Sequence, residues 1–206
     1  MRAPFAFLFT AALLSSPASR AQVVPDSLAK IGHILVVFEE NRSFDNLFGN
    51  FPGADGLQNA VNAPKQVDRD GHVYATLPPV IDTNAEPPGP DSRFPLNLPN
   101  APFKIDGYVS LEQKTGDLIH AFYQEQLQID GGRMDKFVAW SNAASLVMGY
   151  FDASETAVWK FAGEYALGDR MFHSAFGGSF LNHAYLVCSC AFRFPGPRAR
   201  RGRTAR

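Results

Sequence analysis

The sequence predicts an α/β fold, and three features lead to this prediction. Residues 33–38, HILVVF, form a continuous apolar run rich in β-branched side chains, which is typical of a strand buried on both faces of a parallel sheet. Residues 115–128 carry apolar side chains at a helical period. Residues 171–190 pass from a strand-like segment through two glycines into a helix that starts at about Ser179. This order of strand, helices, strand, glycine turn and helix indicates an α/β domain, of which we expect only the first part to be present.

The first 21 residues, MRAPFAFLFTAALLSSPASRA, predict a secretory signal peptide. They combine an early basic residue, Arg2, with an apolar run and a small-residue end, and we expect cleavage near Ala21/Gln22. A membrane anchor is the rival interpretation, but the run is shorter than the roughly 20 residues of a spanning helix, and Pro17 interrupts it. The mature protein is therefore expected to be periplasmic or secreted, with no stable membrane anchor.

Residues 22–190 are expected to belong to one domain. Within them, FDNLF at residues 44–48 predicts a short helix that Ser43 caps and Gly49 closes. Residues 50–107 hold ten of the 15 prolines, which predicts a long ordered loop or an excursion over the edge of the sheet, and loops of this length are often functional. Further helical patterns cover residues 134–148 and 154–167.

The charges are distributed unevenly along the chain. Residues 22–190 contain 11 basic and 20 acidic side chains, a net charge of −9, although the whole chain has a net charge of −1. A negative domain argues against nucleic acid as a partner and is compatible with the binding of cations.

The last 16 residues, 191–206, form a basic tail with no hydrophobic pattern. One interpretation is a basic arm for nucleic acid or a membrane surface. The interpretation that we favour is a change of reading frame or a truncation, since strings of Arg, Gly, Pro and Ala are what GC-rich codons yield out of frame. We therefore expect this tail to lie outside the domain.

Acids and an amide follow the predicted strand directly. Ligands of open α/β sheets bind beyond the carboxyl ends of the strands, where Glu39, Glu40 and Asn41 lie. A carboxylate beside an amide carbonyl offers hard oxygen ligands to a divalent cation. Neighbouring strand residues point to opposite sides, so only one of the two glutamates is expected to face a site. The alternative is a solvated turn in which Asn41 or Asp45 caps the helix.

A second candidate region is GGSFLNH, residues 177–183. Its serine, Ser179, starts a helix, where free N–H groups and the helix dipole attract an anion, so it is a candidate nucleophile for a phosphate ester. Asn182 and His183 follow three and four residues later, close to the same helix face. The alternative is an ordinary helix cap. His120 stands within an apolar helical pattern, where a histidine is either structural or catalytic.

These segments together resemble a bacterial phosphoesterase family that contains acid phosphatases and phosphocholine-preferring phospholipases C, relatives of alkaline phosphatase. The resemblance rests on HILVVFEENRSFDNLFG, on DLIHAFYQEQLQIDGGRMDKFV and on FHSAFGGSFLNH, and it covers residues 31–190. It implies an α/β/α sandwich on a largely parallel sheet, with one divalent metal ion and a hydroxyl nucleophile. The implied substrate is a small phosphate ester or a phospholipid, and the metal's identity stays open.

The resemblance also implies roles for individual residues. Glu40 and Asn41 correspond to a metal ligand and a ligating or phosphate-contacting amide, Ser179 to the nucleophile and a third ligand, and His120 to an active-site histidine. Asn182 and His183 are expected to contact the substrate. The family takes further ligands, an Asp-Asp pair and a histidine, from a region well beyond residue 190, and this chain has no counterpart. The alternative function is therefore an inactive fragment, or a secreted anion-binding module.

Overall fold

The computed structural model describes residues 28–188, which divide into two units. The first unit runs from Met1 to Glu39 and the second from Glu40 to Arg206. The predicted signal peptide, residues 1–21, and the predicted basic tail, residues 191–206, lie outside the described residues.

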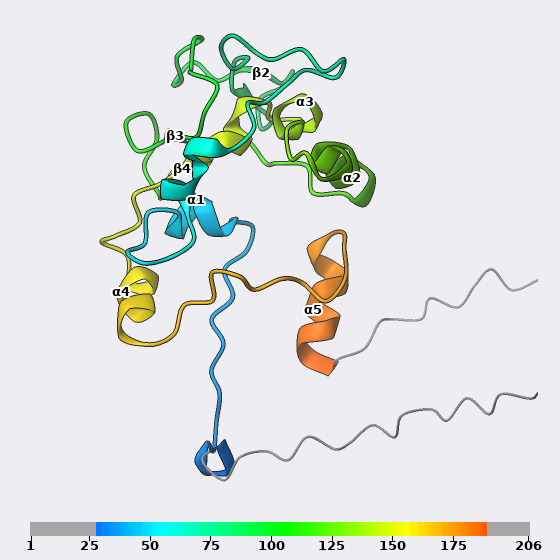
Figure 1. Cartoon of the computed structure of the whole chain (residues 1–206). Helices are drawn as coiled ribbons and strands as arrows, with labels where there is room; N and C mark the ends of the chain where they lie inside the picture. The colour runs from blue at the N-terminus through cyan, green and yellow to red at the C-terminus, as the bar shows by residue number, and fades with distance from the viewer. Residues whose placement is uncertain (1–27, 189–206) are drawn as a thin grey trace, which may run out of the picture. The chain divides into compact units, whose positions relative to one another are not determined.

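Short helices make up most of the regular structure in the second unit (Figure 1). The α-helices are α1 (Phe44–Phe48), α2 (Phe122–Ile129), α3 (Phe137–Trp140), α4 (Ala157–Glu164) and α5 (Ser179–Cys188). Four 3₁₀ helices are also present among the described residues, at Leu28–Lys30, Leu57–Asn62, Asp130–Gly132 and Ser145–Met148. No helix in the range 28–188 is long and apolar enough to cross a membrane.

The helix predictions hold best where the sequence carries a local cap. Helix α1 occupies FDNLF as predicted, because the Ser43 side chain accepts a hydrogen bond from the Asn46 N–H. Helix α5 begins at Ser179 as predicted. The three patterns between residues 115 and 167 yield shorter helices than expected, and the pattern at 134–148 is divided between α3 and a 3₁₀ turn.

The strands are short, and they form one antiparallel and one parallel pair. Strands β1 (Ile81–Asp82) and β2 (Gly89–Pro90) pair antiparallel. Strands β3 (Phe103–Lys104) and β4 (Gly149–Tyr150) pair parallel, with Phe103 opposite Gly149. The described chain is therefore mixed α/β, as predicted, while an α/β/α sandwich on one large sheet is not confirmed.

The predicted buried strand HILVVF is not a strand in this structure. Residues 31–40 carry no helix or strand hydrogen-bonding pattern, and most of their apolar side chains are exposed. The strand-like segment expected ahead of Gly177 likewise forms no strand. A central strand is stabilised by neighbours on both edges, and the described residues supply no sheet into which either segment could insert.

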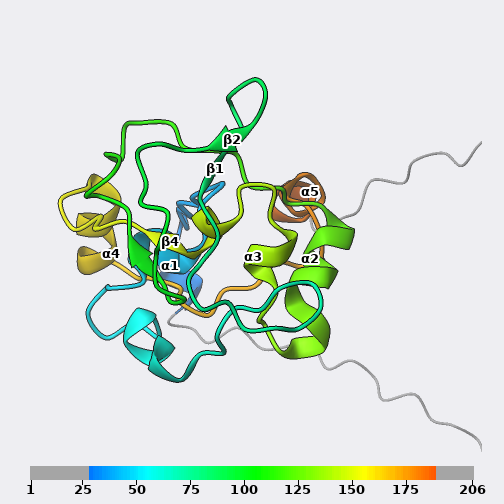
Figure 2. The same ribbon diagram turned by 90° about the horizontal axis from the view of Figure 1, so that it is seen from above.

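The hydrophobic core of the second unit is built mainly from loop residues. Most of it comes from the proline-rich segment 50–107 and from residues 138–153, and its largest fully buried apolar side chains are Phe151, Leu77, Ile105, Val80 and Val109. Helix α2 packs against α3, and the two lie side by side in both views of the chain (Figures 1 and 2). The long loop is thus ordered, as predicted, and it also supplies much of the core.

An ion pair inside this loop stabilises it in a pH-dependent manner. The guanidinium of Arg93 donates to the carboxylate of Asp91 at 2.6 Å and 2.9 Å, and only 5% of the Asp91 side chain is exposed. These hydrogen bonds hold the pKa of Asp91 below its ordinary value, against the opposing effect of burial. The Asp91 N–H also binds the carbonyl of Val80 in the core.

We expect acid to remove the contribution of Asp91 to stability. A carboxyl group with a lowered pKa in the folded state stabilises the fold above its unfolded pKa of about 3.9, and this stabilisation is lost as the pH falls through the folded-state pKa. Urea unfolding at pH 7 should therefore show Asp91→Asn to be less stable than the unchanged protein by on the order of 1 kcal/mol. The difference should shrink at pH 3. An equal difference at both pH values would contradict this assignment.

Candidate active site

Two glycines place Ser179 at the start of α5. Gly177 has φ +124°, a conformation that side chains other than hydrogen disfavour, so the chain turns sharply there. A Cβ atom on Gly178 would lie 3.3 Å from the backbone oxygen of His120, so the glycine lets these two backbone segments approach closely. The rings of Phe122 and Phe176 meet edge to face at 5.3 Å beside this contact. The start of α5 is therefore packed against the segment that leads into α2.

The side chain of Asn182 stabilises the turn that precedes Ser179 through hydrogen bonds. Its side-chain oxygen accepts from the N–H of Ala175 at 3.1 Å, and its NH₂ group donates to the carbonyl of Ala175 at 3.0 Å. A longer bond of 3.5 Å reaches the carbonyl of Gly178. Only 4% of Asn182 is exposed. Both the oxygen and the NH₂ group of this amide therefore bind the turn. The expected contact between Asn182 and a substrate stays a prediction.

The carboxylate of Glu40 lies at the centre of a group of side chains that come from three separate segments of the sequence. Nε2 of His183 donates a hydrogen bond to it, and the hydroxyl of Ser179 lies near enough to lower its pKa by hydrogen bonding. Hydrogen bonding from Ser179 is the largest influence on the pKa of Glu40 and lowers it, and desolvation, which comes next, opposes this effect. The hydrogen bond from His183 lowers the pKa further, and the charges of His183 and, last, of His120 act in the same direction. The structure therefore brings four of the predicted site residues together: Glu40, His120, Ser179 and His183.

Helix α1 and strand β4 hold the chain that follows Glu40. The Asn46 side chain donates to the carbonyl of Gly149 at 2.7 Å, and the Asn46 carbonyl accepts from Phe151 N–H at 2.8 Å. Arg42 donates to the Asn46 side chain at 3.2 Å and lies over the Phe151 ring. The fifth residue of interest, Asn41, is exposed directly beside Glu40. Its role as a ligand stays a prediction.

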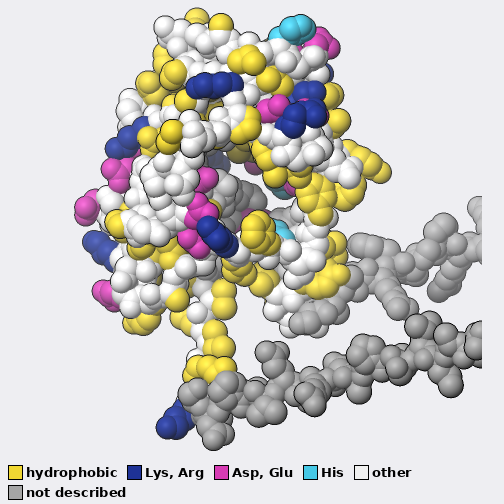
Figure 3. All heavy atoms as spheres, viewed as in Figure 1, with side chains coloured by type: hydrophobic (Ala, Val, Ile, Leu, Met, Phe, Trp, Pro, Cys, Tyr) yellow, Lys and Arg dark blue, Asp and Glu magenta, His cyan; other side chains and the backbone are white. Residues whose placement is uncertain are grey.

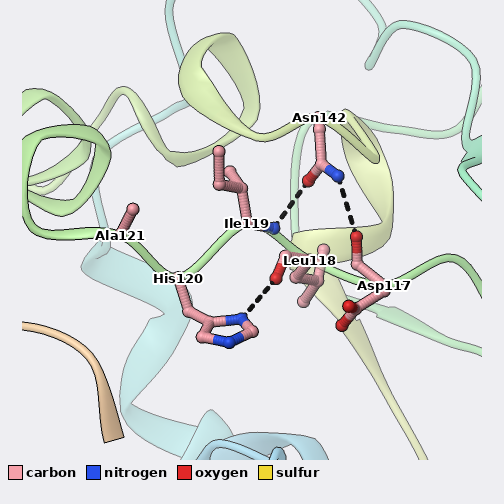
Figure 4. A pocket seen from close by; sticks show the side chains of 6 residues that line it. All are labelled: Asp117, Leu118, Ile119, His120, Ala121 and Asn142. Atoms are coloured by element: carbon pink, nitrogen blue, oxygen red, sulfur yellow. Dashed lines mark hydrogen bonds between the residues drawn. The ribbon is translucent and has the colours of Figure 1, made fainter. Parts of the chain in front are cut away.

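His120 borders an open hollow of about 310 Å³ (Figure 4). Its Nδ1 lies 2.7 Å from the carbonyl oxygen of Leu118, and because a carbonyl can only accept, Nδ1 carries the proton. In the neutral ring this leaves the lone pair on Nε2. Asn142 shapes the hollow by accepting from Ile119 N–H at 2.6 Å and donating to the Asp117 carbonyl at 2.9 Å.

The donor atoms around Glu40 fit a divalent cation as part of a ligand set. Glu40, Asn41 and Ser179 offer a carboxylate, an amide carbonyl and a hydroxyl, which are hard oxygen donors. The carboxylate and the hydroxyl lie near each other, since Ser179 is the main cause of the lowered pKa of Glu40. Three protein ligands are fewer than such an ion holds, so water or a substrate oxygen would complete its coordination.

A second group of metal-type side chains lies in the turn at residues 68–72. The candidate ligand atoms of Asp68, Asp70 and His72 are all within 4.8 Å of one another. The Asp68 carboxylate accepts from the N–H groups of Asp70 and His72, each at 2.9 Å, so it serves to close the turn. Nothing at this turn indicates a ligand, and we assign no site to it.

A comparison with protein-family models gives a match over most of the chain. The model described as the Phosphoesterase family matches residues 31–204, which includes every residue of the group around Glu40. The matched range continues through most of the predicted basic tail. The origin of that tail is not tested by the match.

Proposed function

Because the chain belongs to the Phosphoesterase family, whose name denotes hydrolysis of phosphate esters, we propose that Ser179 is its nucleophile and that Glu40 helps to bind one divalent metal ion. The observation that carries the proposal is the convergence of Ser179 and His183 on the carboxylate of Glu40, with His120 close enough to influence its pKa. Ser179 and His183 lie on the same helix, but Glu40 is 143 residues from His183 in the sequence. The meeting of these groups therefore depends on the fold.

In the proposed reaction, the oxygen of Ser179 attacks phosphorus in line with the leaving oxygen. The Ser179–phosphorus bond forms while the bond to the leaving group breaks, and the hydroxyl proton passes to a nearby base. Water then attacks the phosphoserine, which releases phosphate and restores the hydroxyl. A divalent ion held by Glu40, Asn41 and Ser179 would lower the pKa of the serine hydroxyl and neutralise charge on the phosphate oxygens.

Chain groups other than the nucleophile have distinct proposed roles. The lone pair of His120 Nε2 is suited to take up a proton and to return it to the leaving oxygen. The N–H groups at the start of α5 can bind phosphate oxygens. The exposed rings of Phe122 and Phe176 beside the start of α5 would contact an apolar leaving group. An aryl phosphate and a phospholipid both contain such a group.

The metal requirement is the first property to test. We expect turnover of p-nitrophenyl phosphate, or of p-nitrophenylphosphorylcholine, to stop in the presence of a chelator and to return when a divalent ion is added. Glu40→Gln should raise the metal concentration required for half-maximal rate by on the order of tenfold or more, because it removes the charged ligand. Glu39→Gln is the matched control and should leave this concentration unchanged. Equal effects of the two substitutions would contradict the role of Glu40.

A second candidate function is an anion-binding module without turnover. Two observations favour it. The set of candidate metal ligands, Glu40, Asn41 and Ser179, is small, and His183 already binds one oxygen of the Glu40 carboxylate that a metal ion would need. This alternative predicts that inorganic phosphate binds to the folded protein while neither substrate is hydrolysed with any divalent ion. The rate assay and a phosphate-binding titration on the same sample therefore separate the two functions.

A further inference from the structure

The first unit exposes an unusually apolar segment. Residues 31–37, IGHILVV, run as an extended ribbon without helix or strand hydrogen bonding (Figure 1). The exposed fractions reach 80% for Ile34 and 90% for Leu35, and about 60% for Val36 and Val37. Apolar side chains also gather along this segment in the space-filling view (Figure 3). Single exposed apolar residues are ordinary, but a contiguous run of this kind indicates a contact surface.

The composition of this segment favours contact through strand pairing. It is rich in β-branched residues, it contains no proline, and residues 31–38 carry no carboxylate, lysine or arginine. A segment of six or seven such residues pairs readily with an identical segment in another chain, because backbone N–H and C=O groups form the contact. Flanking charges normally limit such pairing. The nearest charge before this segment is Lys30, the last residue of the 3₁₀ helix Leu28–Lys30, and the nearest charges after it are Glu39 and Glu40; all three residues are exposed.

These flanking charges select one alignment between two copies. In a parallel alignment, Lys30 would lie beside the partner's Lys30 and Glu39 beside the partner's Glu39, so that like charges meet. In the antiparallel alignment that places Ile34 opposite Leu35, Lys30 of each copy lies opposite Glu39 of the other. That alignment is symmetric about a two-fold axis, and it forms two opposite-charge pairs, one at each end. Opposite charges on facing strands stabilise a pair, and like charges destabilise it.

We propose that residues 30–39 form a self-association site, in which the segment pairs antiparallel with the same segment of a second copy. The backbone and the apolar side chains supply the attraction, and the Lys30–Glu39 pairs set the direction and the register. The proposal does not depend on the phosphoesterase activity, because it involves none of the groups around Ser179.

Charge-reversal variants of the full chain test this alignment directly. Sedimentation velocity at low ionic strength should show a concentration-dependent dimer of the unchanged protein. Lys30→Glu and Glu39→Lys should each raise its dissociation constant about tenfold, because each variant places like charges at both ends. An equimolar mixture of the two variants should dimerise again, since each copy then meets opposite charges. The double variant, K30E with E39K, should also dimerise.

Two results would overturn the proposal. A monomer at every concentration would show that the segment does not pair. Association that is equally strong in both single variants, with no gain on mixing them, would assign the contact to another surface. Leu35→Asp provides a further check, because it places a charge in the middle of the segment and should abolish the dimer of the unchanged protein, of the double variant and of the mixture alike.

Discussion

Replacing Ser179 with alanine is expected to lower the rate of p-nitrophenyl phosphate hydrolysis by a factor on the order of 10³ or more. The substitution removes the oxygen that would attack phosphorus, and with it the hydroxyl that lowers the pKa of Glu40. Ser179 begins α5 and is partly buried, so the loss of one oxygen should leave the helix in place. Initial rates at saturating metal, together with circular dichroism of the same samples, provide the measurement.

Ser174→Ala is the matched control for this experiment. Ser174 belongs to the same FHSAFGGS stretch, is exposed, and lies outside the group around Glu40. Its replacement should leave the rate within about twofold. If Ser179→Ala retained the full rate, a different residue or a metal-bound water would be the nucleophile. If the unchanged protein gave no turnover while phosphate still bound to it, the anion-binding alternative would hold.

The features that could be predicted from the sequence are those that depend on neighbouring residues. Ser43 caps α1 through a hydrogen bond that spans three residues, and the two glycines before Ser179 allow the turn that starts α5. Each of these signals is complete within a short stretch. The candidate residues Glu40 and Ser179 follow in the same way from a strand-end motif and a helix-start motif, and the structure brings the Ser179 hydroxyl near enough to lower the pKa of Glu40.

The features that could not be predicted depend on distant partners. HILVVF has the composition of a buried strand, but burial requires neighbouring strands, and composition carries no information about whether they are present. The core residues Leu77 and Val80 are separated only by two prolines, which fit neither a helix nor a central strand, so no regular period reveals them. The contact between His183 and Glu40 joins residues 143 positions apart. The helical spacing of His183 from Ser179 indicated a shared face, but not what that face contacts.

The difference between what a sequence motif indicates and what the fold does with it is clearest at Asn182, whose side chain binds the turn before Ser179. Sequence spacing placed its amide near the substrate, whereas the structure uses that amide to hold the backbone of Ala175. Ser179 follows this turn by only four residues, and its hydroxyl must lie near enough to Glu40 to lower the pKa of that carboxyl group. Asn182 is therefore expected to act as a positioning residue, which controls where the nucleophile lies without itself contacting phosphorus.

Asn182→Leu should consequently lower kcat by about 10- to 100-fold and change KM little, because a small displacement of a reacting oxygen has a large effect on rate. It leaves the N–H and the carbonyl of Ala175 without their partner, which should destabilise the protein by about 1–3 kcal/mol. Asn182→Asp keeps the acceptor for the Ala175 N–H and loses the donors, so its kcat should fall between those of the unchanged protein and Asn182→Leu. Steady-state kinetics and urea unfolding of both variants provide the measurement.

Val187→Ala is the control for general effects on α5, because Val187 is 84% exposed on the same helix, and it should change neither kcat nor stability appreciably. A rise in KM with an unchanged kcat in Asn182→Leu would instead support the substrate contact that the sequence predicted. A loss of stability with no change in either kinetic constant would limit Asn182 to a structural role. The kcat and KM values therefore decide between the two assignments of this amide, since a positioning residue affects the reacting oxygen and a binding residue affects the substrate's affinity.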